Sequence, residues 1–217
     1  CYGADSINLI VYPATMASFT MDKSPLEGCE PLDFQLLSTS SNAVKYEWIV
    51  GQTKSFDENP TYSLPYGTYD IKLKVTSVNG CTDSVSQAGI INVYKSPVAN
   101  FGWNPLNPYV TNPTAFFVNL TTPKDFSNQY HWKMQTDKDY TDLRENVFGL
   151  EPAYTWYPQP GDNVAGDYFV TLDAYSVNKA PSGFTYECHD TISKMITIIN
   201  DNLLFPTAVT PNGDGIN

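Results

Sequence analysis

Basic side chains are scarce in this chain of 217 residues. It has 12 lysines and arginines against 23 aspartates and glutamates, which leaves a formal net charge of −11. Nucleic acids and anionic membrane surfaces attract proteins through Lys and Arg on phosphate, so this balance argues against both as partners. No apolar run approaches the ~18 residues of a membrane-crossing helix, so no membrane span is predicted.

Residues that support catalysis or metal binding are also few. The two histidines are His131, between Tyr130 and Trp132, and His189, next to Cys188. Neighbouring residues on a strand point to opposite faces, so His189 and Cys188 cannot act together as base and nucleophile. Cys and His do not cluster at the spacing of a zinc site, and no glycine-rich phosphate loop is present. The sequence therefore predicts a protein that is not an enzyme and needs no cofactor.

Aromatic, Pro and Gly residues are abundant: 15 Tyr, 11 Phe, 4 Trp, 16 Pro and 13 Gly. This mixture suits many short strands joined by turns. The segment YDIKLKV, 69–75, alternates apolar and polar residues with period two, which is typical of a strand half buried against a core. The best helical candidate is Tyr140–Asn146, and its periodicity is not convincing. An all-β fold is predicted.

The chain contains an internal repeat. Two stretches share the same order of motifs, and a Cys followed by an acidic residue and a hydroxyl residue closes each one, at Cys81 and Cys188. CYGADSI, from Cys1, matches the same closing element. The matched pairs are VYPATMASF 11–19 with VYKSPVANF 93–101, YEW 46–48 with YHW 130–132, FDENPTY 56–62 with FGLEPAY 148–154, and GTYDIKLKVTSVN 67–79 with GDYFVTLDAYSVN 166–178.

The repeat divides the chain into four parts. Residues 1–15 are predicted to be the last strand of an upstream unit, 16–95 one whole unit, 96–200 a second unit, and 201–217 the start of a further domain. Insertions after Trp132, Tyr154 and Asn178 lengthen the second unit.

About seven strands in 80 to 105 residues is typical of an immunoglobulin-like β-sandwich, so tandem seven-stranded sandwiches are predicted. Trp48 and Trp132 would be the core aromatics of the third strands. Tyr69 and Tyr168, at the start of the sixth strands, would make corner hydrogen bonds.

The repeated motifs resemble a known family. Tyr-x-Trp, Pro-x-Tyr, Gly-x-Tyr-x-x-x-Leu and Asn-Gly-Cys are similar to those of polycystic-kidney-disease (PKD) domains, which are strung along large bacterial surface proteins. The family's Gly-Asp-Gly turn after the Trp is missing, because IVGQTKS follows Trp48 and KMQTDKD follows Trp132. The resemblance implies a sandwich that serves as a spacer or an interaction module.

The end of the chain, FPTAVTPNGDGIN, 205–217, resembles the first strand of the gliding-motility-associated C-terminal domain. That domain is the type B sorting signal of the type IX secretion system of Bacteroidetes. A calcium site is disfavoured, since Asn212 and Asp214 supply two side chains where six or more oxygens are needed. A disordered tail would not explain the apolar LLFPTAV. The resemblance implies export to the cell surface, with the secretion machinery or an outer-membrane anchoring protein as partner.

Two functions follow from these resemblances. The first is a non-enzymatic stalk in a large secreted adhesin associated with gliding. The alternative is a carbohydrate-binding accessory module of an exported polysaccharide-degrading enzyme, in which loop aromatics stack on surface polysaccharide. The candidates for stacking are Trp103, Tyr109, Trp156 and Tyr157. An exposed, coplanar pair of these rings would favour the binding module, and buried rings would favour the stalk.

Ser6, Ser84 and Thr191 lie in Asp-Ser/Thr-aliphatic sequences at equivalent places of the repeat. This pattern matches the O-glycosylation signal that Bacteroidetes use on exported proteins, so these three hydroxyls are predicted to carry glycans. The competing interpretation is that a hydroxyl after a turn caps that turn.

Cysteines of a protein outside the cell are expected to form disulfides. In a sandwich of this topology, Cys29 in the turn between strands one and two lies at the opposite end from Cys81, between strands six and seven. The strand between them is about 23 Å long, and a disulfide requires α-carbons within about 7 Å. The one-two turn of a unit instead faces the six-seven turn of the next unit. Cys29 is therefore predicted to pair with Cys188, and Cys81 and Cys1 with cysteines further upstream.

Overall fold

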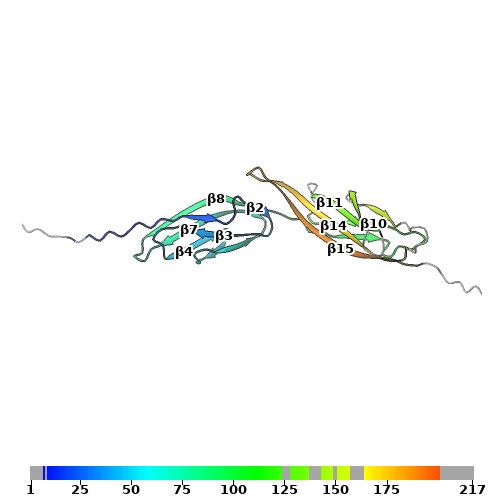
Figure 1. The fold of residues 1–217 in the computed structure, drawn as a ribbon, viewed down its shortest axis with the longest axis horizontal. Helices are drawn as coiled ribbons and strands as arrows, with labels where there is room; N and C mark the ends of the chain where they lie inside the picture. Colours follow the sequence, from blue (N-terminus) through cyan, green and yellow to red (C-terminus); the bar gives the residue numbers. More distant parts are fainter. Residues whose placement is uncertain are drawn as a thin grey trace, which may run out of the picture. The chain divides into compact units, whose positions relative to one another are not determined.

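The structure is a computed structural model that describes residues 7, 9–123, 128–136, 143–148, 151–156 and 164–200. The described residues form strands, turns and bends, which confirms the all-β fold (Figure 1). This part of the chain contains no helix that is long and apolar enough to cross a membrane. Segments 1–6 and 201–217 lie outside the described residues, so the assignments that the sequence suggests for them stay predictions.

The chain divides into two compact units. Unit 1 is Cys1–Ser96 together with Ser176–Cys188, and unit 2 is Pro97–Tyr175 together with His189–Asn217. The predicted division at residues 95 and 96 gave the whole of 96–200 to the second sandwich. The structure differs for residues 176–188, which end a hairpin of the second repeat but pack with unit 1.

Unit 1 contains a sandwich of two sheets. A three-stranded sheet has the order β1-β3-β6, and a five-stranded sheet has the order β2-β8-β7-β4-β5. The strands are β1 Phe19–Met21, β2 Leu26–Cys29, β3 Leu32–Ser38, β4 Lys45–Val50, β5 Thr53–Ser55, β6 Thr61–Leu64, β7 Gly67–Thr76 and β8 Thr82–Tyr94.

This sandwich has eight strands rather than the predicted seven, because its first strand is split. β1 pairs with β3 in one sheet, and β2 pairs in parallel with β8 in the other. Pro25 stands between the two pieces, and proline has no amide hydrogen with which to continue a ladder. The split brings Cys29 opposite Tyr94, at the far end of β8 from Cys81.

The core of the first sandwich follows the predicted alternation. On β7, Ile71, Leu73 and Val75 are buried, while the polar residues between them are exposed. Trp48 is 0% exposed, and its indole nitrogen donates to the carbonyl of Asp57 at 3.0 Å. The Tyr69 hydroxyl donates to the carbonyl of Pro65 at 2.9 Å, which is the expected corner bond.

Unit 2 contains the second sandwich. Its sheets have the orders β13-β10-β9 and β12-β11-β14-β15. The strands are β9 Phe101–Asn104, β10 Thr114–Asn119, β11 Asn128–Gln135, β12 Leu143–Phe148, β13 Ala153–Thr155, β14 Gly166–Lys179 and β15 Thr185–Ile198. The described part of 140–146, for which helical periodicity was not convincing, belongs to β12, which pairs with β11.

The core of the second sandwich has the same central tryptophan and corner tyrosine as the first, and it contains one more buried indole. Trp132 is fully buried, and Phe101 and Phe117 contact it with ring centroids 5.2 and 5.6 Å away. The Tyr168 hydroxyl donates to the carbonyl of Val164 at 2.9 Å, the second corner bond. Trp156 adds a further buried indole.

Candidate functional site

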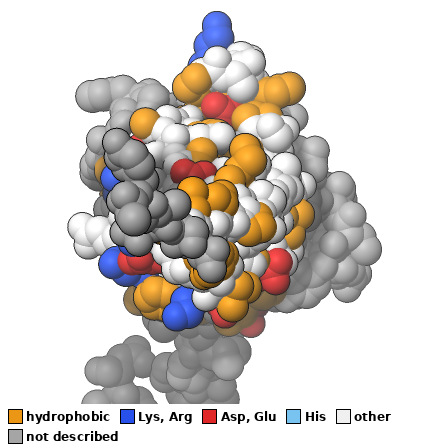
Figure 2. All heavy atoms as spheres, turned by 90° about the vertical axis from the view of Figure 1, so that its left-hand side faces the viewer, with side chains coloured by type: hydrophobic (Ala, Val, Ile, Leu, Met, Phe, Trp, Pro, Cys, Tyr) orange, Lys and Arg blue, Asp and Glu red, His pale blue; other side chains and the backbone are white. Residues whose placement is uncertain are grey.

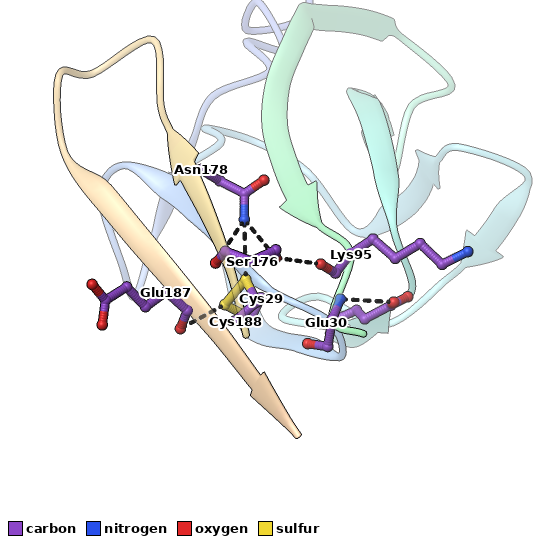
Figure 3. Close-up of a disulfide and its surroundings, with 8 residues drawn as sticks. Cys29, Glu30, Lys95, Ser176, Asn178, Glu187 and Cys188 are labelled. Carbon is purple, nitrogen blue, oxygen red and sulfur yellow. Dashed lines mark hydrogen bonds between the residues drawn. A yellow bond between two sulfur atoms is a disulfide. The ribbon is translucent and has the colours of Figure 1, made fainter. Parts of the chain in front are cut away.

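A disulfide joins Cys29, the last residue of β2, to Cys188 on β15 (Figure 3). The α-carbons are 5.3 Å apart, within the range that a disulfide requires, and 159 positions separate the two residues in sequence. These are the two cysteines that the sequence analysis paired. Cys188 is completely buried.

Hydrogen bonds hold the end of the β14–β15 hairpin around this bond. The Ser176 hydroxyl donates to the carbonyl of Lys95 at 2.9 Å (Figure 3). The Asn178 amide donates to the Ser176 hydroxyl at 3.0 Å and lies 3.7 Å from the sulfur of Cys188. Ser176 is itself buried, so its hydroxyl is satisfied where an unpaired one would be costly.

The outer part of the hairpin contacts β2 and β8. Tyr186 stacks on Tyr94 with ring centroids 5.7 Å apart and an angle of 25° between the planes. The Ser182 hydroxyl donates to the carboxylate of Glu27. Burial raises the pKa of Tyr94 and of Tyr186, and the negative charge of Glu27 raises both further. An aromatic pair, a charged hydrogen bond and a covalent bond therefore fix the same 13-residue segment, Ser176–Cys188.

Glu30, which follows the bonded Cys29, holds the chain where it leaves the first sandwich. Its carboxylate accepts from the amide of Tyr66 at 2.9 Å and from the amide of Ser96 at 3.2 Å. The Glu30 amide donates to the carbonyl of Tyr94 at 2.9 Å. Ser96 is the last residue of unit 1 before Pro97. Cys29 thus forms the disulfide, and the next residue, Glu30, holds the point where the chain leaves the first sandwich.

Cys81 forms no disulfide within the described residues. It precedes β8, whereas Cys29 lies beside the last residue of that 13-residue strand. Such a strand spans roughly 40 Å, so a bond between Cys29 and Cys81 is excluded by distance. The proposed upstream partners of Cys81 and Cys1 stay predictions, and Cys1 lies outside the described residues.

The three candidate stacking rings that the structure describes do not form an exposed pair. The prediction fails for Trp156, which is 2% exposed and donates its indole hydrogen to the carbonyl of Gln135 at 2.9 Å. Trp103 is partly buried against the core, and its indole nitrogen donates to the carbonyl of Leu106 at 2.9 Å. Tyr109 is 49% exposed, and Tyr157 lies outside the described residues. Trp156 and Trp103 are therefore packed in or against the core and are not free to stack on a sugar.

Two of the three predicted glycosylation sites are described, and both are exposed. Ser84 lies on β8 and Thr191 on β15. The Thr191 hydroxyl donates to the carboxylate of Asp173 at 3.2 Å. Ser6 lies outside the described residues. Exposure is necessary for a glycan but does not demonstrate one, so the three sites stay predictions.

The aspartate of the same motif has a structural role that the sequence analysis missed. The Asp83 carboxylate accepts from the amide of Ala17 at 2.8 Å, and the Asp190 carboxylate accepts from the amide of Ala99 at 2.7 Å. Ala17 and Ala99 are equivalent in the repeat, so each aspartate fastens the start of its sandwich to the last strand. The sequence feature that indicates this role is the recurrence of Asp before Ser or Thr at the same place in each repeat.

Comparisons with known proteins give structural neighbours only. No protein-family model matches the chain, and no curated protein matches it. The PKD1 domain of the Vibrio cholerae metalloprotease PrtV has 29% identity and a TM-score of 0.31, and the match covers 37% of this chain and 98% of that one. The PKD1 domain of Vibrio anguillarum Epp has 23% identity, a TM-score of 0.31, and coverage of 38% and 98%.

A third neighbour contains a bound carbohydrate. The glucan-utilization protein SGBP-B of Bacteroides ovatus, in complex with a mixed-linkage heptasaccharide, has 15% identity and a TM-score of 0.32. That match covers 87% of this chain and 48% of the neighbour.

Proposed function

We propose that this chain is a stretch of a non-enzymatic spacer in an exported protein of the cell surface. The disulfide between Cys29 and Cys188 is the observation that carries the proposal. Disulfides persist in oxidising compartments, which supports a location outside the cell. The bond also joins the end of the β14–β15 hairpin to β2 within unit 1.

Tandem repetition extends the proposal to the residues before the first sandwich. Leu9 and Val11 are 84% and 80% exposed, whereas their counterparts in the repeat, Ile91 and Val93, are 0% and 2% exposed. Apolar side chains as exposed as these lack the core that would bury them. We therefore propose that residues 1–15 complete a preceding sandwich, and that Cys81 serves that sandwich as Cys188 serves this one.

The finer proposal is a gliding-associated adhesin that the type IX secretion system exports. It is supported by the resemblance of residues 205–217 to the sorting domain and by the repeat that precedes them. The partner of that domain would be the secretion machinery or an outer-membrane anchoring protein. In the native organism, disabling type IX secretion should move the protein from the surface fraction to the periplasm. Unchanged surface exposure would contradict this part of the proposal.

The carbohydrate-binding alternative has weaker support. Trp103 and Trp156 pack in or against the core, and Tyr109 is the one described candidate ring with much exposed surface. On the face shown in Figure 2, hydrophobic side chains are interspersed with acidic and basic ones, without a broad area of one charge. Aromatic platforms for sugars need rings that are free to stack, and the described rings are mostly engaged elsewhere.

Native affinity electrophoresis in gels that contain a panel of surface polysaccharides separates the two functions. For a spacer we expect equal mobility with and without polysaccharide. Retardation that Tyr109→Ala abolishes would establish the binding module in place of the spacer. Tyr66→Ala is the matched control, because Tyr66 is also an exposed tyrosine, at 61%, but belongs to unit 1.

Intact-mass spectrometry of protein from the native organism tests the glycans. We expect hexose-bearing species whose added mass falls stepwise in Ser84→Ala and Thr191→Ala. Ser86→Ala is the control, since Ser86 lies on the same strand as Ser84 but does not follow an aspartate. Unmodified native protein would remove the glycosylation hypothesis and leave the spacer intact.

A further inference from the structure

We infer that the Cys29–Cys188 disulfide is a load bypass, which keeps most of both sandwiches out of the path of a force applied at the chain ends. The inference deepens the proposed spacer function and rests on it. It follows from the connectivity of the chain and requires no particular arrangement of the two units. The bond spans 159 positions, so almost three quarters of the chain lies between its two ends.

A covalent cross-link changes the route that tension takes. A pull on the two ends is transmitted along the backbone to Cys29, across the sulfur–sulfur bond to Cys188, and on along the backbone. Once the contacts that hold the two arms have broken, residues 30–187 form a closed loop that carries no tension from the ends. Strands β3 to β14 lie entirely within this loop. These strands cannot be drawn out while the bond is intact, whatever the stability of their sandwiches.

Only two short arms can be extended. The first arm contains the 28 residues before Cys29, and the second contains the 29 residues after Cys188. An extended chain spans at most about 3.3–3.6 Å per residue, so both arms together provide roughly 200 Å. Opening the bond would add 159 positions, or about 560 Å.

The first arm is held by the split strand. β1 pairs with β3 over Phe19–Met21, and β2 pairs in parallel with β8 over Leu26–Cys29. Leu26 is 1% exposed in the core, and the Asp83 carboxylate holds the amide of Ala17. These contacts must break before the first arm lengthens.

The second arm is held by the rest of β15. Ile196 and Ile198 are each 1% exposed in the second core. The Lys194 ammonium donates to the side-chain oxygen of Asn100 at 2.7 Å, and the Asp190 carboxylate holds the amide of Ala99. Both arms therefore begin at the disulfide and are fastened by the same kind of aspartate bond.

The hairpin contacts also protect the bypass from reduction. Thiol–disulfide exchange requires a thiolate to reach one of the two sulfurs. Cys188 is fully buried, while Cys29 is partly exposed, so attack is confined to the sulfur of Cys29. Tyr186 stacked on Tyr94 holds the hairpin in place beside that sulfur. Disrupting the stack should speed reduction without removing the bond itself.

Single-molecule pulling on the whole chain, with handles at both ends, tests the inference. Non-reducing peptide mapping of the same preparation first establishes the Cys29–Cys188 bond. We expect the oxidised protein to lengthen by no more than about 200 Å, with no event as long as a sandwich. Adding a phosphine reductant to the folded protein should then release about 560 Å more, in two sandwich-sized events.

Two variants complete the test. Cys29→Ser with Cys188→Ser should extend fully without reductant, and Cys81→Ser, the matched control, should behave as the unaltered chain. Oxidised protein that lengthens like the double variant, or mapping that finds no Cys29–Cys188 bond, would overturn the bypass. Retention by polysaccharide would instead remove the spacer function and leave the force result unaffected.

Discussion

The β7–β8 and β14–β15 hairpins occupy equivalent places in the repeat, and their ends make different contacts. In the first, Ser77 accepts from the amide of Cys81 at 3.0 Å, and its own amide donates to the carbonyl of Cys81 at 2.8 Å. In the second, the equivalent Ser176 donates to the carbonyl of Lys95, and Cys188 is bonded to Cys29. The same serine closes a local turn in one hairpin and makes a long-range bond in the other.

The cause of this difference is length. Cys81 follows Ser77 by four positions, whereas Cys188 follows Ser176 by twelve. Four residues suffice for a closed turn, with Gly80 at a φ of +85° that other residues rarely adopt. In the longer hairpin the strands continue past Ser176 and Cys188, which stay close enough for the Asn178 amide to contact both, and each of the two makes its own bond to unit 1. The insertion thereby replaces a closed local turn with a hairpin end that makes contacts with β2 and β8.

The largest expected effect comes from shortening the second hairpin to match the first. Deleting residues 180–187, with Lys179→Gly, should close a local turn from Ser176 to Cys188, remove the contacts of Ser182 and Tyr186 with Glu27 and Tyr94, and break the bond to Cys29. The cross-link closes a loop of 159 positions, for which chain entropy predicts a loss of up to about 5 kcal/mol in the free energy of unfolding. Urea denaturation measures the loss, and thiol titration should find two additional free cysteines.

Cys29→Ser with Cys188→Ser is the control for that deletion, since it removes the bond and keeps the hairpin length. A deletion variant that retains the disulfide would show that insertion length does not control this bond.

The two core tryptophans test whether the sandwiches are energetically alike. Trp48→Ala and Trp132→Ala each remove a fully buried indole, and each should cost about 3–5 kcal/mol in the unfolding of its own sandwich. Trp48→Phe and Trp132→Phe, which keep an aromatic ring, should cost less. Denaturation followed by hydrogen exchange assigns each loss to a unit. A loss shared equally by both units would contradict the division into two cores.

The hydrogen bonds that Asp83 and Asp190 accept predict that the stability of the protein falls in acid. Hydrogen bonds from the amides of Ala17 and Ser84 lower the pKa of Asp83. A lowered pKa in the folded state contributes stability above the unfolded value of about 3.9, and this contribution is lost as the pH falls through the folded value. Asp83→Asn should therefore lower the Tm at pH 7. Below pH ~4 the difference in Tm between the variant and the unaltered protein should become smaller.

Asp190→Asn should likewise lower the Tm at pH 7, through the second unit, because it removes the equivalent bond to Ala99. Asp33→Asn is the control for both, since Asp33 is an exposed residue on β3. Equal effects of Asp33→Asn and Asp83→Asn would show that net charge, and not the hydrogen bond, is responsible.

The smallest effect is expected at Tyr62, which stacks on Phe34 with its hydroxyl buried and without a partner in the described residues. Burial, and secondarily Asp57, raises its pKa to about 12. A raised folded pKa contributes stability below the unfolded value of about 10, which is lost as the pH rises toward 12. Tyr62→Phe should change stability by less than about 1 kcal/mol at pH 7 and reduce the alkaline loss.

Tyr154→Phe, at the equivalent position of the second repeat, is the comparison for Tyr62→Phe. Thermal melts at pH 7 and 11 measure both variants. A large loss in Tyr62→Phe at pH 7 would reveal a partner for its hydroxyl.

Features that depend on period and chain order were accessible from the sequence. The alternation in YDIKLKV places Ile71, Leu73 and Val75 on the buried face, because side chains on a strand alternate in direction. The corner tyrosines Tyr69 and Tyr168 followed from their place before the same strand. The pairing of Cys29 with Cys188 followed from the order of strands in a sandwich.

Other features depend on which distant groups meet, and no local pattern encodes that. The split of the first strand, the burial of Trp156 and the bonds of Asp83 and Asp190 all arise when segments far apart in sequence pack together. The end of the second hairpin is the clearest case. Its residues belong to the second repeat, but the Tyr94–Tyr186 stack and the disulfide join it to unit 1. The sequence of a hairpin sets its length, and packing energy selects the surface it covers.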